Sequence, residues 1–252
     1  MSYQQMAILY DKFMQDAPYD LWISFTEEVI NQYGKNVSQI ADLGCGTGEI
    51  TKRLAQKGYH MTGVDYSAEM LTIAEQKASE DRLSIRLIHQ DLRELEGLAD
   101  IDAVVSYCDV INYITETSDL EKVFQNIADC LIDGGLLIFD MHSMNHVEEN
   151  LVNHTFADVT EDSSYIWYCT EGEQPGEMYH DLTFFLLDEG THKYTRFDET
   201  HHQRTYPIHF YVGLLKKLGF ININFYGDFS LKSENLHENS ERIFITAEKG
   251  SR

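Results

Sequence analysis

The sequence predicts an α/β fold, in which a parallel β-sheet alternates with helices and is followed by an antiparallel β insertion. Two observations carry this prediction. From residue 37 to about residue 142, short apolar runs alternate with amphipathic helical patterns, which is the signature of βαβ units. Between residues 145 and 203 the chain instead shows alternating β-forming residues, which is typical of antiparallel strands.

Five strands are expected in the parallel sheet. The pattern places them at residues 39–43, 59–65, 83–88, 101–107 and 136–141. Helices are expected at residues 49–57, 68–78 and 120–131, and Asp133-Gly134-Gly135 is expected to end the third of them. The last strand is so apolar that both of its faces should be buried.

The remaining elements flank this sheet. In the insertion, strands are expected at residues 164–170, 179–187 and 191–200, with a hairpin turn at residues 188–190. After Pro207 we expect a helix that Gly219 ends, and then two strands at residues 220–229 and 242–248. Before the first strand we expect helices at residues 4–15 and 19–33. The chain therefore divides into a main domain, residues 1–144 and 204–252, and an insertion, residues 145–203.

The composition narrows the class of partner. The 252 residues include 19 Lys and Arg against 42 Asp and Glu, a formal net charge of -23. Such a charge disfavours nonspecific binding to nucleic acid or to an anionic membrane. The four cysteines are widely spaced, which favours a reducing cytoplasm, and no apolar run approaches a membrane span of roughly 20 residues. We expect a soluble cytoplasmic protein without a membrane anchor.

The most informative segment is the glycine-rich run at residues 42–48, Asp-Leu-Gly-Cys-Gly-Thr-Gly, between the first strand and the helix expected at residues 49–57. Glycines there allow a sharp turn and a close approach of ligand to backbone. Asp65 ends the second strand, where a carboxylate can accept hydrogen bonds from both ribose hydroxyls. Together these features predict a ligand that contains adenosine.

A missing glycine indicates which ligand this is. A dinucleotide loop would read GxGxxG, with a pyrophosphate at the helix N-terminus, but position 49 is Glu. A carboxylate there opposes phosphate. A cofactor that has a ribose and no phosphate fits this loop better than NAD does.

With these motifs the sequence resembles the class I S-adenosylmethionine-dependent methyltransferases. The matching segments are residues 42–48, residues 64–67 with Met70, residues 90–92, residues 102–113, residues 131–139 and residues 214–220. The resemblance implies a Rossmann-like seven-stranded mixed sheet whose last strand is antiparallel. It also implies S-adenosylmethionine as the cofactor.

The resemblance further implies a set of cofactor-binding residues. The backbone of Gly44, Cys45 and Gly46 would face the methionine and ribose portions, and Asp65 would bind the ribose. Around the adenine, the resemblance implies Tyr66, Met70, Asp91 and Leu92. A carbonyl near Tyr107 or Cys108 would help to hold the methionine amino group.

Residues 10–11 and 18–22 resemble the helical lid of small-molecule members such as glycine N-methyltransferase and the aminosugar N-methyltransferases. In that comparison a tyrosine closes over the sulfonium, where a ring face gains cation–π stabilisation and water is excluded. Tyr19 is the expected residue, in both a cofactor-binding and a catalytic role.

Two side chains at strand ends are candidates for acceptor chemistry, Asp109 and His142. His142 is either catalytic or a hydrogen-bonded wall residue. His180, His192, His201 and His202 could suggest a metal, but adjacent histidines on a strand point to opposite faces, and solvated or pocket-lining histidines are favoured. No metal is expected.

We therefore predict methyl transfer from S-adenosylmethionine to a small-molecule acceptor by a monomer or homodimer, with the insertion covering the acceptor pocket. An RNA base methyltransferase and a non-catalytic sensor of S-adenosylmethionine are the alternatives, and a nicotinamide dehydrogenase is a weaker one. The sequence leaves open the acceptor and whether nitrogen, oxygen or carbon is methylated.

Overall fold

The computed structural model describes residues 17–188, 190–232 and 235–251, so the helix expected at residues 4–15 and the motif at residues 10–11 lie outside the described residues. The main sheet has seven strands in the order β10-β11-β5-β4-β1-β2-β3. Their bounds are β1 Gln39–Leu43, β2 His60–Asp65, β3 Arg86–His89, β4 Ile101–Ser106, β5 Leu131–His142, β10 Phe220–Gly227 and β11 Arg242–Lys249. The first five pair in parallel, and β11 is antiparallel to both of its neighbours. The predicted mixed sheet with an antiparallel last strand is confirmed.

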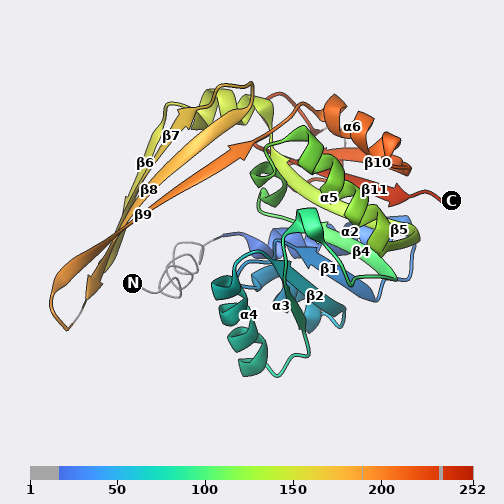
Figure 1. Cartoon of the computed structure of the whole chain (residues 1–252), viewed down its shortest axis with the longest axis horizontal. Helices are drawn as coiled ribbons and strands as arrows, with labels where there is room; N and C mark the ends of the chain where they lie inside the picture. The colour runs from blue at the N-terminus through green and yellow to red at the C-terminus, as the bar shows by residue number, and fades with distance from the viewer. Residues whose placement is uncertain (1–16, 189, 233–234, 252) are drawn as a thin grey trace.

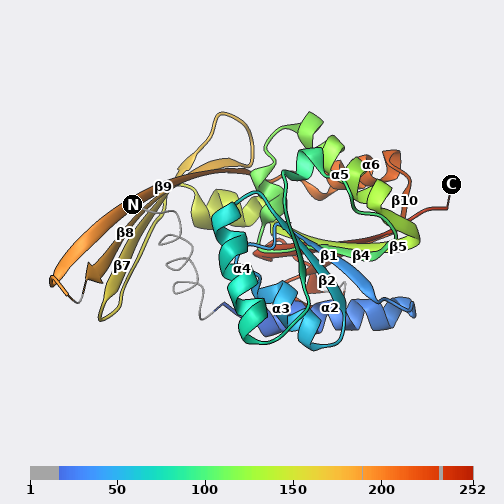
Figure 2. The same ribbon diagram turned by 60° about the horizontal axis from the view of Figure 1, so that its bottom comes forward.

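Helices cover both faces of this sheet (Figure 2). They are α2 Tyr19–Tyr33, α3 Glu49–Gln56, α4 Ala68–Glu80, α5 Thr117–Cys130 and α6 Ile208–Lys217, with short helical turns at Leu92–Glu94, Val110–Tyr113 and His146–Leu151. Alternate residues of a strand reach opposite faces. In β1, Ile40 packs with α2 and α3, whereas Ala41 and Leu43 pack with α5 and α6. A central strand is therefore buried on both sides, as β5 is from Leu136 to Met141, including its one charged residue, Asp140.

The insertion forms a separate four-stranded antiparallel sheet, which extends away from the main sheet as a long arm (Figure 1). Its strands, in spatial order, are β6 Thr155–Val159, β7 Ser163–Glu171, β8 Glu177–Asp188 and β9 Lys193–Arg204. The sequence predicts three of these strands and misses β6. That strand is short, lies at an edge and is largely exposed, so it carries no apolar alternation.

The structure corrects the expected end of α5 and start of β5. The helix ends at Cys130 and the strand begins at once at Leu131, which pairs with Ile101. The next pair joins Leu136 to Ala103, so residues 132–135 form a bulge inside the strand. Gly134, at φ +71°, turns the chain within this bulge and does not end the helix.

Other boundaries also differ from those expected; β9, for example, continues to Arg204 and not only to residue 200. In three places a turn explains the difference. The third strand starts at Arg86 and not at residue 83, since the Leu83 N–H bonds the Ala78 carbonyl at the end of α4. The hairpin turn extends through His192, whose N–H bonds the carbonyl of Asp188. Strand β10 ends at Gly227, before two residues with positive φ.

None of the helices among the described residues is both long and apolar enough to cross a membrane.

Candidate active site

The glycine-rich loop between β1 and α3 is tied to the end of β2. The N–H groups of Gly44 and Cys45 both donate to the carbonyl of Val64, at 2.8 and 3.0 Å. Gly44 has φ +79°, and a Cβ placed on it would lie 2.4 Å from Cγ1 of Val110. Glycine is therefore required at position 44 by both backbone conformation and space.

Beside this loop, Asp65 presents a carboxylate that two backbone groups hold in place. The Gly46 N–H donates to Oδ2 at 2.7 Å and the Ser67 N–H donates to Oδ1 at 2.8 Å. A Cβ on Gly46 would meet nothing within 4 Å, so the space above the loop is open. Burial raises the pKa of Asp65, and the backbone hydrogen bonds oppose that rise. An anchored carboxylate next to open space over glycine fits a ribose, since each oxygen keeps acceptor capacity.

Behind the loop, Asp42 supports it from a buried position. Thr51 donates its hydroxyl to Oδ2 of Asp42 at 2.6 Å. Burial raises the pKa of Asp42 to about 7. Cys45 packs against Gly63, where a Cβ would lie 2.9 Å from its sulfur, and burial raises the pKa of the Cys45 thiol. The thiol therefore stays protonated and acts as a small packing group.

The residues expected around an adenine lie at the ends of β2 and β3. Tyr66 is 74% exposed, and Met70 is in the first turn of α4, where its N–H donates to Ser67. Asp91 is paired with Arg93, whose Nε lies 2.9 Å from Oδ1, and this guanidinium lowers the pKa of the carboxyl. An adenine amine would share Asp91 with Arg93. The roles of these residues stay predictions.

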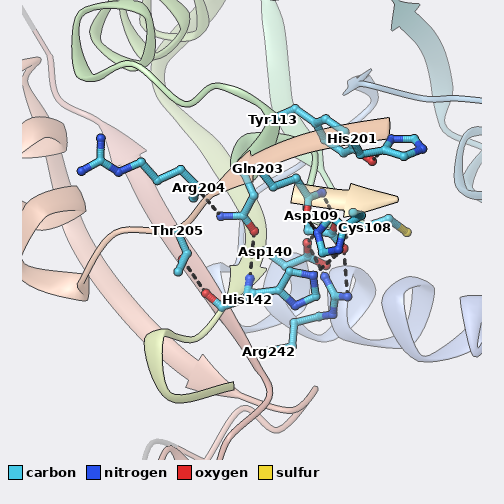
Figure 3. A network of polar contacts seen from close by, with 12 residues as sticks. Cys108, Asp109, Tyr113, Asp140, His142, His201, Gln203, Arg204, Thr205 and Arg242 are labelled. Atoms are coloured by element: carbon cyan, nitrogen blue, oxygen red, sulfur yellow. Dashed lines mark hydrogen bonds and ion pairs between the residues drawn. The ribbon is translucent and has the colours of Figure 1, made fainter. Parts of the chain in front are cut away.

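A second group of polar side chains gathers where β4 and β5 end, and Asp140 is its centre (Figure 3). This carboxylate is 0% exposed. It accepts from Trp22 Nε1 at 2.5 Å and from Arg242 Nη1 at 2.9 Å. It also accepts from the backbone N–H groups of Cys108 and Asp109, at 3.2 and 2.8 Å. Asp140 therefore holds two consecutive residues at φ +57° and +54°, a strained conformation that concentrates at functional sites.

Asp109 itself points its carboxylate into the same group. Oδ2 accepts from Gln203 Nε2 at 2.8 Å, and Oδ1 accepts from Arg242 Nη2 at 3.1 Å. Nε2 of His142 lies 3.5 Å from Oδ1. Burial alone would raise the pKa of Asp109, but His142, Arg242 and Gln203 together hold it well below its usual range. Asp109 is therefore ionised at neutral pH and can stabilise a protonated imidazole.

The backbone around His142 is fixed by side chains from two other elements. The Asn112 Oδ1 accepts from the His142 N–H at 3.0 Å, and its Nδ2 donates to the Arg204 carbonyl at 3.1 Å. The Thr205 hydroxyl donates to the His142 carbonyl at 2.6 Å. The end of β5 is thereby joined to the exit of β9.

Several members of this group are not among the residues that the sequence patterns predict: Trp22, Asn112, Asp140, Gln203 and Arg242. Only Asp140 could have been identified from the sequence. Asp140 is the single charged residue in the otherwise apolar run at residues 136–141, and a carboxylate there needs partners. Trp22 and Asn112 lie inside the matching segments 18–22 and 102–113, although no role was assigned to them, and nothing in the local sequence marks Gln203 or Arg242.

Tyr19 lies near this group but is packed into the core. It is 7% exposed, its ring centroid is 6.2 Å from that of Trp22, and the Arg53 guanidinium lies 5.6 Å from its ring centroid. The structure thus places Tyr19 one helical turn before a partner of Asp140. Its closure over a cofactor stays a prediction.

Adjacent histidines of the insertion point to opposite faces of the sheet and have different partners, as expected for a strand. His201 Nδ1 lies 3.0 Å from the Tyr113 hydroxyl, and His202 Nε2 lies 2.7 Å from Oε1 of Glu177. His180 is buried between two insertion side chains that are considered below. Within the described parts of the chain, no three His, Cys, Asp or Glu residues are grouped so that they could hold a metal ion.

A pocket of about 510 Å³ opens beside His142. Two aromatic rings, Trp22 and Phe229, line it together with His142, His146 and Arg242, and exposed acidic residues border it. The rings of His142 and His146 are stacked, with centroids 5.4 Å apart. The volume is within the range of pockets that enclose small molecules.

Fold and loop together define a nucleoside-binding α/β domain with an acidic and histidine-containing site at the same sheet edge. Residues 40–135 match the family described as a methyltransferase domain. Over 251 residues the chain is 41% identical to the "Putative methyltransferase" of Geobacillus sp. (strain WCH70), covering 99% of this chain and 100% of that protein.

Solved structures of methyltransferases have the same fold. The S-adenosylmethionine-dependent methyltransferase from Clostridium acetobutylicum ATCC 824 superposes with a TM-score of 0.89 at 30% identity, covering 99% of each chain. The sugar N-methyltransferase KedS8 from Streptoalloteichus sp. has the same fold, with a TM-score of 0.78 at 18% identity over 96% of this chain and 93% of its own. The chain belongs to the class I S-adenosylmethionine-dependent methyltransferases, and the predicted cofactor is confirmed.

Proposed function

We propose that the protein methylates a nucleophilic nitrogen or oxygen of a small molecule bound in the pocket beside His142, and that the Asp109–His142 pair accepts the proton that the acceptor loses. The observation that carries this proposal is the position of that pair at the sheet edge, next to a pocket of about 510 Å³. KedS8, which has the same fold, is named as acting on a sugar.

S-adenosylmethionine, when bound, supplies a methyl group on a sulfonium sulfur. Asp65 and the backbone of Gly44 and Gly46 would hold the nucleoside, since the anchored carboxylate and the open space beside it fit that group. The main tasks left to the protein are alignment and exclusion of water.

Proton transfer belongs to His142. With its Nε2–H directed at Asp109, the ring keeps a lone pair on Nδ1, which can take a proton from the acceptor. Asp109, ionised and held by Gln203 and Arg242, then stabilises the imidazolium. An amine acceptor that arrives neutral loses its proton to the same group after attack.

The charge distribution favours a small acceptor over RNA. Asp228 and Glu241 border the pocket, and the buried Arg242 is already shared by Asp109 and Asp140. The rim is therefore acidic, which repels a phosphate backbone and attracts amine-bearing molecules.

The test is incubation with methyl-labelled S-adenosylmethionine and either the small-molecule filtrate of a cell extract or purified RNA. We expect a labelled small product. We expect His142→Gln to lower kcat about 100-fold while the KM for S-adenosylmethionine stays unchanged, because proton transfer is lost and the cofactor site is intact. His209→Gln, at an exposed histidine on α6, is the matched control. Label in RNA, or a His142→Gln variant as active as the control, would contradict the proposal.

A further inference from the structure

Three polar side chains, one half-buried and two buried, form a line of hydrogen bonds that crosses the insertion on one face and ends at Asp109. They are Trp167 on β7, His180 on β8 and Gln203 on β9. His180 pairs directly with Cys169 and His201, so Trp167 and Gln203 each lie two positions from its direct partners, on the same face and in diagonal contact. His180 is 5% exposed and Gln203 is 3% exposed. Burial of this kind is costly unless every polar atom is satisfied.

The hydrogen bonds along this line have fixed directions. The Trp167 indole N–H donates to Nδ1 of His180 at 2.9 Å, and an indole nitrogen can only donate. Nδ1 therefore carries the lone pair, and Nε2 of His180 carries the hydrogen that it donates to Oε1 of Gln203 at 3.0 Å. The Gln203 amide then donates to Oδ2 of Asp109 at 2.8 Å, and an ionised carboxylate can only accept. With a donor at one end and an acceptor at the other, a single arrangement of hydrogens satisfies the whole line.

Burial supports the same arrangement by keeping His180 neutral. It lowers the pKa of His180 to about 4, and the hydrogen bond to Gln203 opposes the shift only in part. A second ring N–H, on Nδ1, would also face the Trp167 donor. His180 therefore keeps one tautomer through the neutral pH range.

We propose that His180 and Gln203 are positioning residues for Asp109, so that the insertion determines which carboxylate oxygen faces His142. Gln203 occupies Oδ2, and this leaves Oδ1 toward His142 and Arg242. Trp167, farthest from Asp109, fixes the direction of the line. This inference rests on the proposed role of the Asp109–His142 pair, and it gives the insertion a part in acceptor activation that does not require contact with the cofactor.

The first measurement needs no acceptor. In the full chain labelled with ¹⁵N-histidine and saturated with S-adenosylhomocysteine, NMR should show His180 protonated on Nε2 alone. Gln203→Met keeps the side-chain length but cannot donate, and it should shift the ring nitrogen signals of His142. Trp167→Phe should let the second His180 tautomer appear. His202→Gln is the matched control, because His202 is next to Gln203 but faces the other side and bonds to Glu177 within the insertion; it should leave the His142 signals unchanged.

The second measurement is turnover of the small-molecule filtrate. Gln203→Met should lower kcat about tenfold or more through misalignment of Asp109, with the KM for S-adenosylmethionine unchanged, and His202→Gln should have little effect. Wild-type His180 protonated on Nδ1, or His142 signals that respond equally to Gln203→Met and to the control, would overturn the inference. If wild-type protein turns over no filtrate component, the proposed function fails, while the NMR comparison still decides whether the insertion positions Asp109.

Discussion

Two buried carboxylates of this protein, Asp109 and Asp42, have pKa values that are shifted in opposite directions, and their hydrogen-bond partners explain the difference. Asp109 faces a guanidinium, an imidazole and an amide donor, which together hold its pKa well below the usual range. Asp42 has one side-chain donor, Thr51, and burial raises its pKa to about 7. The number and charge of nearby donors, and not burial by itself, decide the protonation of each.

Asp42 predicts a pH dependence of stability. Its folded pKa, about 7, lies above the model-peptide value of 3.8, so the folded chain holds a proton that the unfolded chain has released. The free energy of unfolding should therefore fall as pH rises from about 4 to about 7, with a slope of about 1 kcal/mol per pH unit from this group. Urea unfolding of cofactor-free protein measures it. In Asp42→Asn this contribution should vanish, and parallel stability curves for the two proteins would contradict the assignment.

At the scale of the element, the loop between β1 and α3 requires glycine at position 44, because the Val110 side chain leaves no space for a Cβ there. Gly44→Ala would combine φ +79° with a contact of 2.4 Å to Val110. We expect it to cost about 2 kcal/mol or more in stability and to weaken binding of S-adenosylhomocysteine. Thermal unfolding and calorimetry measure these two effects.

Two further variants separate the causes. Gly58 has φ +99° with nothing within 4 Å of a built Cβ, so Gly58→Ala reports backbone strain alone. Val110→Ala removes both close methyl groups and should restore part of the loss in Gly44→Ala. The steric explanation would be contradicted if Gly44→Ala lost no more stability than Gly58→Ala. It would also be contradicted if adding Val110→Ala restored none of the stability lost in Gly44→Ala.

The sequence predicted those elements whose residues follow a strong period. The strands of the parallel sheet and the helices between them appear at or near their expected positions, and so do three insertion strands. What it missed depends on contacts between distant elements. Strand β6 is exposed and lacks alternation, the bulge at residues 132–135 depends on pairing with β4, and Gln203 meets Asp109 only because β9 returns to the end of β5.

At the scale of the whole molecule, the chain segments that enter and leave the insertion meet at the end of β5. Residues 142 and 205 are in direct contact through the Thr205 hydroxyl. We expect that residues 145–203 can be replaced by a short Gly-Ser linker with the main sheet still folded and able to bind S-adenosylhomocysteine. Turnover of the filtrate should be lost, because Gln203 and the pocket-lining His146 are removed.

Calorimetry and thermal unfolding of the shortened chain, with and without S-adenosylhomocysteine, test whether the main sheet folds and binds this ligand without the insertion. Stabilisation by about 2.7 kcal/mol at a ligand concentration 100 times Kd would show an intact cofactor site. A shortened chain that still turns over the filtrate at the wild-type rate would contradict the part given to the insertion in acceptor activation.

The central claim is that the cofactor is held at the edge of the main sheet by the glycine loop and by the carboxylate of Asp65. Isothermal titration with S-adenosylhomocysteine tests it most directly, using wild-type protein, Asp65→Ala and the exposed control Asp133→Ala. Loss of hydrogen bonds from the ribose hydroxyls should weaken binding at least about tenfold in Asp65→Ala and leave the control unchanged. Equal affinity in all three proteins would contradict the account.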